Sequence, residues 1–597
     1  MPESCEKSVE FKFYKGFGTW YDLYKRLHNN EKVKHMNKAW WKESVVYQIY
    51  PRSFQDTNGD GVGDLEGIRS RLGYLQELGV DVLWICPIFK SPNDDNGYDI
   101  SGYQEIMEEF GTMDDFDRLL SDAHERGMKI ILDLVINHTS DEHPWFIESR
   151  SSKDNPKRDY YIWRDGKPDG SPPTNWESFF SGSTWEYDEA TGQYYLHLFS
   201  KRQPDLNWEN PEVVEKLHAM VTWWLDKGID GFRVDAINHI AKAEGFPDAD
   251  DPEGKAIAPA YHLFSNLPRV HDHLQKLNRD VFSKYDIMTV GETSGVGPEG
   301  ALLYMGEDRG EFNMVFQFEH MGIDAGFGGT GRWLKREWSL TELKDIMTKW
   351  QTEVHGRGWN ANYLNNHDQP RAVSRFGNDG PYRKRSAKLL ATFVHTLEGT
   401  PYVYQGEEIG MTNIALPSID DYRDVEIKNF YKAAGAEGWS EERIMEAIWR
   451  RGRDNARTPM QWDASANAGF TTGTPWIAVN ANAGDINVAE SLADPDSIFH
   501  YYRKLIRLRK EHEVFVYGKY ELLLPEHEDI YAYTRTLGGE TLLVVLNFFG
   551  RTPEFRLPDA VAYRSAELLL ANYDASPDEK PDAFALRPYE ARVYLLK

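Results

Sequence analysis

A short run of residues, GFRVDAI at 231–237, combines a cation and a carboxylate with the spacing of a β-strand. Side chains of a strand alternate between its two faces, so Arg233 and Asp235 are expected to point to the same side. A guanidinium beside a carboxylate lowers the pKa of that carboxylate and keeps it ionised, as a nucleophile requires. A structural ion pair at a strand end is the alternative, because such pairs are common and also shift pKa values.

Two further acidic residues favour the catalytic interpretation. Glu292 in VGET at 290–293 and Asp368 in NNHD at 365–368 each follow an apolar run. We expect both of them to lie, like Asp235, at the end of a strand. Three carboxylates at successive strand ends are typical of a site for acid–base or nucleophilic chemistry.

Eight apolar runs with strand character occur along the chain, mostly separated by helical patterns. They lie at 44–50, 80–88, 129–137, 231–237, 286–293, 314–320, 361–368 and 401–410. The segments DLEGIRSRLGYLQELG and DDFDRLLSDAHERG, between the first three runs, are amphipathic with the helical period. Apolar strands that alternate with helices predict an α/β fold with a parallel sheet, and eight repeats predict a (β/α)₈ TIM barrel.

The spacing of the runs predicts additional domains. A long segment rich in Pro, Gly, Ser and aromatic residues separates the third and fourth runs and predicts an inserted subdomain B at 139–210, after strand three. A second insertion is expected at 411–455. Short runs near the end predict a C-terminal antiparallel β domain at 517–597. The barrel itself is expected at 36–138 and 211–516.

The first residues of the chain form a separate hypothesis. Met36 begins MNKAWWKESVVYQIY, which resembles a natural start directly before the first strand. We therefore expect 1–35 to be an N-terminal extension produced by a misplaced start codon. A native helix packed on the barrel is the alternative.

Charge and cysteine content narrow the classes of function. The 597 residues include 68 basic and 95 acidic side chains, and the net charge of −27 would repel nucleic acid or an anionic membrane. The two cysteines, Cys5 and Cys86, are too few for a disulfide framework. The N-terminal region has no apolar run suited to a signal peptide or a spanning helix. We expect a cytoplasmic protein with a small-molecule substrate, and neither nucleic acid nor membrane as partner.

Four segments, DLVINH, RVDAINH, VGET and NNHD, together resemble the α-amylase superfamily of retaining glycoside hydrolases and transglycosidases. QPDLNW at 203–208 and RDNARTPMQW at 453–462 narrow the resemblance to its α-glucosidase and oligo-1,6-glucosidase branch, with sucrose isomerases as near relatives. The order of these segments on successive strands makes the resemblance specific. It extends from Trp40 to the C-terminus.

The resemblance implies glycoside cleavage with retention of configuration. One carboxylate attacks the anomeric carbon while a carboxylic acid protonates the leaving oxygen, and water then hydrolyses the glycosyl-enzyme. Asp235 corresponds to the nucleophile, Glu292 to the acid/base, and Asp368 to a third carboxylate that binds sugar hydroxyls. Burial and neighbouring anions must raise the pKa of Glu292, while Arg233 keeps Asp235 charged.

Further residues correspond to the glucose pocket of the family. Asp95 and Tyr98 are expected to bind and stack on the non-reducing glucose, and His138 and His367 to donate hydrogen bonds to its hydroxyls. A supporting role in the core is the alternative for each histidine. The residues expected to line the pocket and its entrance are Phe180, Phe199, Gln203 and Arg453, with core packing as the alternative for the two phenylalanines.

The loop DTNGDGVGD at 56–64 carries a separate pattern. Oxygen ligands alternate with flexible glycines and could converge on a hard cation, much as in the first half of an EF-hand loop. The candidate ligands are Asp56, Asn58, Asp60, the carbonyl of Val62, and Asp64. An Asx-rich turn without metal is the alternative, but relatives in this branch bind calcium at the matching loop. We expect structural calcium, with magnesium as the alternative, and no organic cofactor.

Ala236, directly after the expected nucleophile, bears on the linkage preference. In this branch valine at this position tends to accompany α-1,6 linkages, and alanine or threonine α-1,4 linkages. A smaller side chain leaves room for the second glucose of maltose, although one or two methyl groups decide only about 1–3 kcal/mol. We expect an exo-acting α-glucosidase that releases α-glucose from the non-reducing ends of maltose and short α-glucosides and prefers α-1,4 bonds.

Other activities are compatible with the same motifs. An oligo-1,6-glucosidase is one alternative, and a sucrose isomerase or transglucosidase is another. HMGIDAGFGGTGRW lacks the Arg- and Asp-rich signature that the isomerases carry after strand six, and no evident basic cluster supports a trehalose-6-phosphate hydrolase. A non-catalytic, transporter-associated subunit is disfavoured, because such proteins have a membrane span and a broken catalytic set.

Overall fold

Eight parallel strands close into a barrel in the computed structural model, which describes residues 38–251, 256–326, 329–576 and 579–597. Around the barrel the order is β1-β13-β12-β11-β10-β9-β5-β2. The strands are β1 (Val46–Ile49), β2 (Val82–Ile85), β5 (Lys129–Val135), β9 (Gly231–Asp235), β10 (Met288–Glu292), β11 (Met314–Phe316), β12 (Asn360–Asn362) and β13 (Thr400–Tyr404). Each overlaps one of the eight predicted runs, so the predicted (β/α)₈ barrel is confirmed. The extension expected at 1–35 lies outside the described residues.

The barrel strands are buried on both faces, as their near-continuous apolar sequences predict. At the start of β9 the chain approaches β10 closely. A Cβ atom on Gly231 would lie 1.8 Å from the carbonyl oxygen of Met288, and the φ angle of this glycine is +141°. Because only glycine fits there, β9 can lie directly against β10 and bring Asp235 near Glu292.

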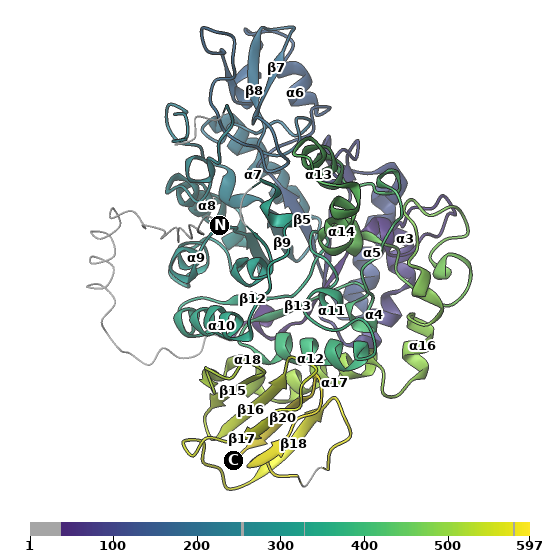
Figure 1. Ribbon diagram of the computed structural model, residues 1–597. Coiled ribbons are helices and arrows are strands. Elements are labelled where there is room, and N and C mark those ends of the chain that lie inside the picture. The colour runs from purple at the N-terminus through teal and green to yellow at the C-terminus, as the bar shows by residue number, and fades with distance from the viewer. Residues whose placement is uncertain (1–37, 252–255, 327–328, 577–578) are drawn as a thin grey trace, which may run out of the picture. The chain divides into compact units, whose positions relative to one another are not determined.

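Helices cover the outside of the barrel (Figure 1). They begin at polar caps, for example the capping box in which Thr112 and Asp115 start α5. The helices that follow successive strands are α3 (Leu65–Ser70) and α4 (Leu72–Leu78), α5 (Met113–Glu125), α7 (Pro211–Asp226), α8 (Arg269–Asp280), α9 (Pro298–Met305), α10 (Leu340–Val354), and α11 (Ala372–Arg375) with α12 (Arg383–Thr396). Shorter helices are α2 (Trp40–Glu43), α15 (Asp454–Arg457) and α16 (Val488–Ala493).

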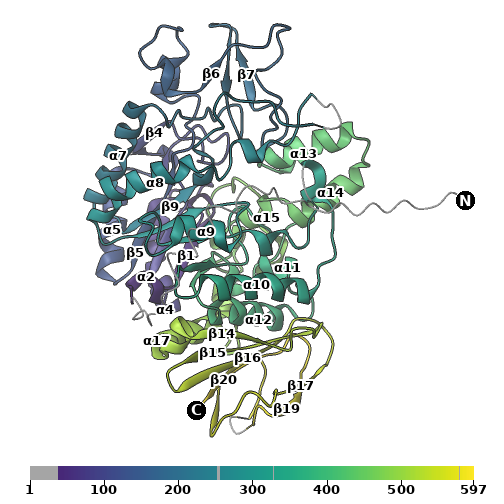
Figure 2. The same ribbon diagram turned by 90° about the vertical axis from the view of Figure 1, so that its left-hand side faces the viewer.

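Insertions follow three of the strands. After β5 come α6 (Pro144–Ser149) and a three-stranded sheet in the order β6-β8-β7, formed by β6 (Trp163–Arg164), β7 (Trp185–Asp188) and β8 (Gln193–Leu196). A hairpin of β3 (Phe89–Lys90) and β4 (Gly102–Ile106) follows β2, and α13 (Val425–Ala436) and α14 (Glu441–Arg451) follow β13. Figures 1 and 2 both show β7 at the opposite side of the barrel from the C-terminal sheet.

The C-terminal part is an antiparallel sheet, as predicted. After α17 (Ile498–Glu511) and α18 (Glu513–Tyr517) the strand order is β14-β15-β16-β20-β18. The strands are β14 (Lys519–Leu523), β15 (Ile530–Leu537), β16 (Glu540–Asn547), β18 (Ala566–Ala571) and β20 (Ala591–Leu596), while β17 (Glu554–Arg556) pairs with β19 (Ala583–Ala585). In the described part of the chain, no helix combines the length and apolarity needed to cross a membrane.

Candidate active site

Arg233 joins three carboxylates at the C-terminal end of the barrel. Its Nη1 lies 2.7 Å from Asp133 Oδ1 and 2.6 Å from Asp235 Oδ1, and its Nη2 lies 2.6 Å from Glu292 Oε2. The strand register explains this, because β5 aligns Asp133 with Arg233 and β10 aligns Val290 with Arg233. Arg233 and Asp235 thus project to the same side of β9, as their spacing predicted.

Asp368 does not lie at a strand end, and the prediction that its run is a strand up to this residue was wrong. The strand β12 ends at Asn362. The polar segment that follows turns instead, and the backbone N–H of Asp368 donates to Asn366 Oδ1 at 2.8 Å. Two cations fix the carboxylate, because Oδ1 of Asp368 lies 3.2 Å from Arg453 Nη1 and 2.8 Å from Arg457 Nη2.

The three predicted carboxylates face a cavity of about 290 Å³. Most of the residues predicted from the sequence line it: Asp95, Tyr98, His138, Phe180, Phe199, Gln203, Asp235, Ala236, Glu292, Asp368 and Arg453. The structure therefore brings together residues that lie far apart in the sequence, from Asp95 to Arg453.

Two predicted residues do not line the cavity. Arg233 lies behind the carboxylates and is 1% exposed. His367 is stacked on Tyr98, with ring centroids 5.1 Å apart and an interplanar angle of 7°. Its Nδ1 lies 2.8 Å from Gln48 Nε2, and its Nε2 lies 3.1 Å from Asp368 Oδ2. This position favours the supporting role for His367.

A network of hydrogen bonds holds the side of the cavity around Asp95. Arg453 Nη2 lies 3.0 Å from Asp95 Oδ1, and Gln203 Nε2 donates to Asp95 Oδ2 at 3.3 Å. The guanidinium of Arg453 also lies 5.1 Å from the centroid of the Phe180 ring. His138 Nε2 lies 3.0 Å from the carbonyl oxygen of Tyr98. These contacts fix charged and aromatic groups around a space that suits a polar ring.

Burial controls the charge of the paired carboxylates. It raises the pKa of Glu292 to about 7, with a further increase from Asp235 and against the effect of Arg233. It also raises the pKa of Asp235 to about 6, although Arg233 acts in the opposite direction. The prediction of a lowered pKa for Asp235 was therefore wrong in its net direction, because burial outweighs the guanidinium. Near neutral pH Asp235 is still mostly ionised, while Glu292 is protonated to a large extent.

The pKa of Asp368 is shifted in the opposite direction to those of Asp235 and Glu292. Burial alone would raise its pKa, but His367, Arg453 and Arg457 together hold it well below its usual range. For Asp95, burial raises the pKa to about 7 despite Arg453. The cavity therefore contains carboxyl groups that differ in their protonation at the same pH, as acid–base chemistry requires.

Several cavity residues were not found from the sequence: Phe179, Asn238, His239, Ser294, Phe318, Arg332, Gln369 and Glu426. Arg332 lies in the 3-10 helix η8 (Gly329–Trp333) and forms an ion pair with Glu426 of α13. No spacing in the sequence connects these two segments. Asp133, by contrast, is an acidic residue inside the apolar strand KIILDLV, and this contrast could have revealed it.

Comparison with known proteins identifies the family. Residues 48–518 match the α-amylase catalytic domain, and residues 520–593 match the C-terminal domain of maltogenic amylase. The chain belongs to the α-amylase family. It is a glycoside hydrolase, and the resemblance inferred from the four motifs is confirmed.

Named relatives of this α-amylase-family chain share most of its length. It is 62% identical over 563 residues to an oligo-1,6-glucosidase of Parageobacillus thermoglucosidasius, covering 94% of this chain and 100% of that protein. Its identity to the trehalose-6-phosphate hydrolase of Bacillus subtilis (strain 168) is 50%, covering 94% of this chain and 99% of that protein. Among solved structures, the isomaltulose synthase of a Klebsiella species matches with a TM-score of 0.90 at 45% identity, covering 94% of this chain and 100% of that chain.

The predicted metal loop of this α-amylase-family enzyme is held by its own backbone. Oδ1 of Asp56 accepts from the N–H groups of Asn58 at 2.9 Å and Gly59 at 2.8 Å, and Oδ1 of Asp64 accepts from the N–H of Gly67 at 2.6 Å. Within the described residues, no group of three or more His, Cys, Asp or Glu side chains is arranged to hold a metal ion. Carboxylate oxygens have further lone pairs, so the oxygen-rich loop is chemically suited to a hard cation, and binding stays a prediction.

Proposed function

We propose that the protein is an exo-acting, retaining α-glucosidase that hydrolyses α-1,6 bonds at the non-reducing ends of short isomalto-oligosaccharides. The observation that carries the proposal is the pair Asp235 and Glu292, held by one guanidinium at a cavity of about 290 Å³. Oligo-1,6-glucosidases that are 62% and 58% identical support the α-1,6 linkage. This linkage replaces the α-1,4 preference as the main proposal.

The proposed mechanism uses the two carboxyl groups in turn. Asp235, largely ionised, attacks the anomeric carbon, and the protonated Glu292 gives its proton to the leaving glycosidic oxygen. Glu292 then takes a proton from a water molecule, and the oxygen of that water attacks the anomeric carbon. The bond between this carbon and Asp235 breaks, and α-glucose is released. Retaining enzymes hold these groups about 5 Å apart. Asp235 and Glu292 each form an ion pair with a different nitrogen of the Arg233 guanidinium, which is consistent with such a spacing.

The walls of the cavity support action at chain ends. Subdomain B contributes Phe180, Phe199 and Gln203, while α13 contributes Glu426. Asp95 and Asp368, both bound by Arg453, would accept hydrogen bonds from the hydroxyls of a terminal glucose. Because two separate insertions line the cavity, its shape is consistent with a pocket that admits one end of an oligosaccharide.

A second candidate is the α-1,4-glucosidase, which the alanine at position 236 favours. Proton NMR of the products formed from isomaltose, maltose and sucrose, followed over time, tests both candidates. Faster release of α-glucose from isomaltose supports the main proposal, and faster release from maltose supports the second. Initial release of β-glucose would contradict retention, and conversion of sucrose into an isomeric disaccharide would indicate an isomerase.

The substitution Ala236→Val is expected to raise the ratio of isomaltose to maltose turnover by about tenfold or more. Ala236 has a φ angle of +45°, and its N–H donates to Glu292 Oε2 at 3.1 Å. A β-branched side chain at positive φ is strained, so Tm should also fall. Kinetics with both disaccharides check the result, and Ala236→Gly, which stays small, is expected to keep the original ratio. An unchanged ratio in folded Ala236→Val would show that this position does not set the linkage.

The pH dependence of kcat/KM is expected to be a narrow bell. Activity should fall below about pH 6, because protonation of Asp235 removes the nucleophile, and above about pH 7, because Glu292 loses the proton it must donate. Rates for isomaltose between pH 4.5 and 9 measure both limbs. With an aryl α-glucoside that needs no acid, Glu292→Gln should keep the acidic limb and lose the alkaline one. A preserved alkaline limb would assign that limb to another group.

We also propose that a hard cation binds the 56–64 loop. Calcium added after treatment with EDTA is expected to raise Tm by a few degrees, because a ligand bound only to the folded state stabilises it. Asp60→Ala should abolish the rise, while Asp559→Ala, an exposed acidic residue of the C-terminal domain, should not. Calorimetry with calcium and then with magnesium measures the effect. The same Tm with and without either cation would favour the metal-free Asx-rich turn.

A further inference from the structure

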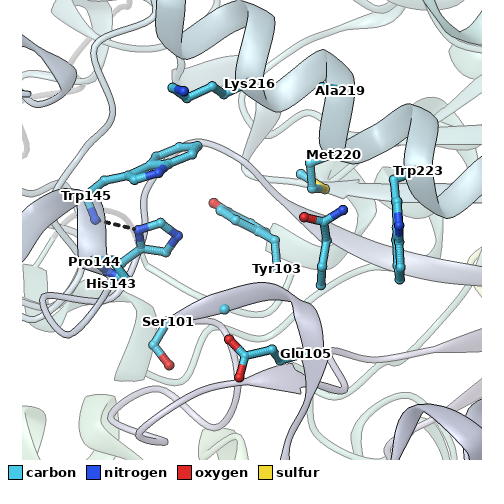
Figure 3. A pocket seen from close by; sticks show the side chains of 12 residues that line it. Ser101, Tyr103, Glu105, His143, Pro144, Trp145, Lys216, Ala219, Met220 and Trp223 are labelled. Atoms are coloured by element: carbon cyan, nitrogen blue, oxygen red, sulfur yellow. Dashed lines mark hydrogen bonds between the residues drawn. The ribbon is translucent and has the colours of Figure 1, made fainter.

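A second pocket lies between β4, α6 and α7, outside the catalytic cavity (Figure 3). Its volume is about 580 Å³, twice the 290 Å³ of the catalytic cavity, and the two share no lining residue. We propose that this pocket binds neutral glucose units inside an α-glucan chain, as a carbohydrate site separate from the catalytic one.

Two tryptophans supply the flat surfaces that a pyranose ring needs. Figure 3 shows Trp145 and Trp223 on opposite sides of the pocket. Trp223 of α7 is 36% exposed and packs edge-on against Trp224, with ring centroids 4.9 Å apart. Trp145 of α6 is half-buried, and its ring centroid lies 4.7 Å from that of His143. Both indoles are thus held in place while part of each stays accessible for stacking.

His143 supplies a hydrogen-bond donor that is otherwise unused. Its side chain is buried, with 5% of the residue exposed, and Nδ1 accepts from the N–H of Trp145 at 3.1 Å. Burial lowers the pKa of His143 to about 4, so near neutral pH the ring is uncharged and carries its proton on Nε2. Figure 3 shows this second nitrogen directed into the pocket, and it has no hydrogen-bond partner among the described residues. This nitrogen is open to solvent in the pocket, so a sugar hydroxyl can take the place of water and accept from it.

The charges around the pocket are already paired. Glu105 Oε2 lies 2.9 Å from Lys90 Nζ, and Lys216 Nζ lies 3.5 Å from Glu212 Oε1. The exposed side-chain amide of Gln104 adds a neutral donor and acceptor at the edge. Paired charges leave little attraction for a phosphate or another ion, and a net charge of −27 repels anions further. The ligand that fits is neutral, rich in hydroxyls and flat on one face.

One residue that lines the second pocket, Tyr103, also contacts the backbone beside the catalytic cavity. The hydroxyl of Tyr103 donates to the carbonyl oxygens of Val135 at 3.0 Å and His138 at 3.3 Å. His138 lines the catalytic cavity. A glucan held at the second pocket would raise the local concentration of chain ends around the enzyme.

Affinity electrophoresis in native gels containing dextran or soluble starch tests the proposal. In these polymers internal glucose units greatly outnumber chain ends, so retardation reports binding that does not require an end. Asp235→Asn protein is used throughout, so that neither polymer is degraded. We expect one of the two polymers to retard the protein, and Trp223→Ala or Trp145→Ala, added to Asp235→Asn, to weaken the apparent affinity by about threefold or more.

Tyr187→Ala is the matched control, because Tyr187 is an aromatic residue of subdomain B that is 51% exposed and lies outside the pocket. It is expected to migrate like its parent. Trp223→Ala in the otherwise unchanged enzyme should hydrolyse p-nitrophenyl α-glucoside at the original rate, which also shows that this variant is folded. The proposal is overturned if neither gel retards the protein, if both tryptophan variants bind as before, or if Tyr187→Ala reduces binding equally.

Discussion

Replacing Asp235 by asparagine is expected to lower kcat by at least about 10⁴-fold while the fold is kept. An amide has nearly the shape of a carboxylate but is a far weaker nucleophile, so the glycosyl-enzyme cannot form at a useful rate. Asp235 is 8% exposed and lies at the cavity, and its Oδ1 is only 2.6 Å from Arg233 Nη1, so the substitution changes charge rather than packing. Turnover of isomaltose, together with circular dichroism and Tm, measures the effect.

Azide distinguishes the two carboxyl groups by the configuration of the product. In Asp235→Ala, azide can enter the vacated space and attack an activated α-glucoside directly, which gives the β-glucosyl azide. In Glu292→Ala, the glycosyl-enzyme still forms and azide opens it from the other face, which gives the α-glucosyl azide. NMR of the products identifies each anomer. An α-azide from Asp235→Ala would show that the assignment of the nucleophile is wrong.

Replacing Arg233 by methionine is expected to destabilise the protein by about 3–5 kcal/mol at neutral pH. The guanidinium is 1% exposed and contacts Asp133, Asp235 and Glu292, so its removal leaves three carboxyl groups without their cation. Since Arg233 lowers the pKa of each of them, the substitution raises these pKa values in the folded state. Folding then takes up protons, so the loss of stability should be larger at pH 7 than at pH 5.

Calorimetric Tm values at the two pH values measure this effect. Arg233→Lys keeps a charge but loses the two-armed contact, so an intermediate Tm is expected. The control is Arg279→Met, because the side chain of Arg279 is 69% exposed and forms its ion pair with the neighbouring Asp280. That variant should lie within about 0.5 kcal/mol of the original protein. A Tm of Arg233→Met equal to that of Arg279→Met would mean that the buried cation is not needed to hold the carboxylates.

Much of the fold follows from local patterns in the sequence. The eight apolar runs fall on the eight barrel strands in order, because burial on both faces requires apolar residues at nearly every position. The two-residue spacing of Arg233 and Asp235 placed them on one side of β9, since alternation is a property of the strand itself. Asp133 could have been identified in the same way, because it is an acidic residue within an apolar strand.

The resemblance to a family located most cavity residues, but it could not give their environment. The pKa of Asp235 depends on two opposing effects, its burial and its distance from Arg233. A sequence gives neither the burial nor the distance. His367 was predicted from the NNHD motif to donate hydrogen bonds to the sugar, but its ring is stacked on Tyr98 and does not line the cavity. The linkage preference suggested by Ala236 differs from the activity named for the relatives, because one methyl group is a small part of a whole subsite.

The sequence by itself determined the order of the strands, the sides to which their residues point, and the carboxylates that could do chemistry. These properties depend on residues within a few positions of one another. Only the tertiary structure decided that Arg332 and Glu426 meet at the cavity, that Asp368 is held by Arg453 and Arg457, and that Trp145 and Trp223 face a second pocket. Each of these depends on segments far apart in the chain, whose proximity and burial are set by packing and leave no periodic pattern in the sequence.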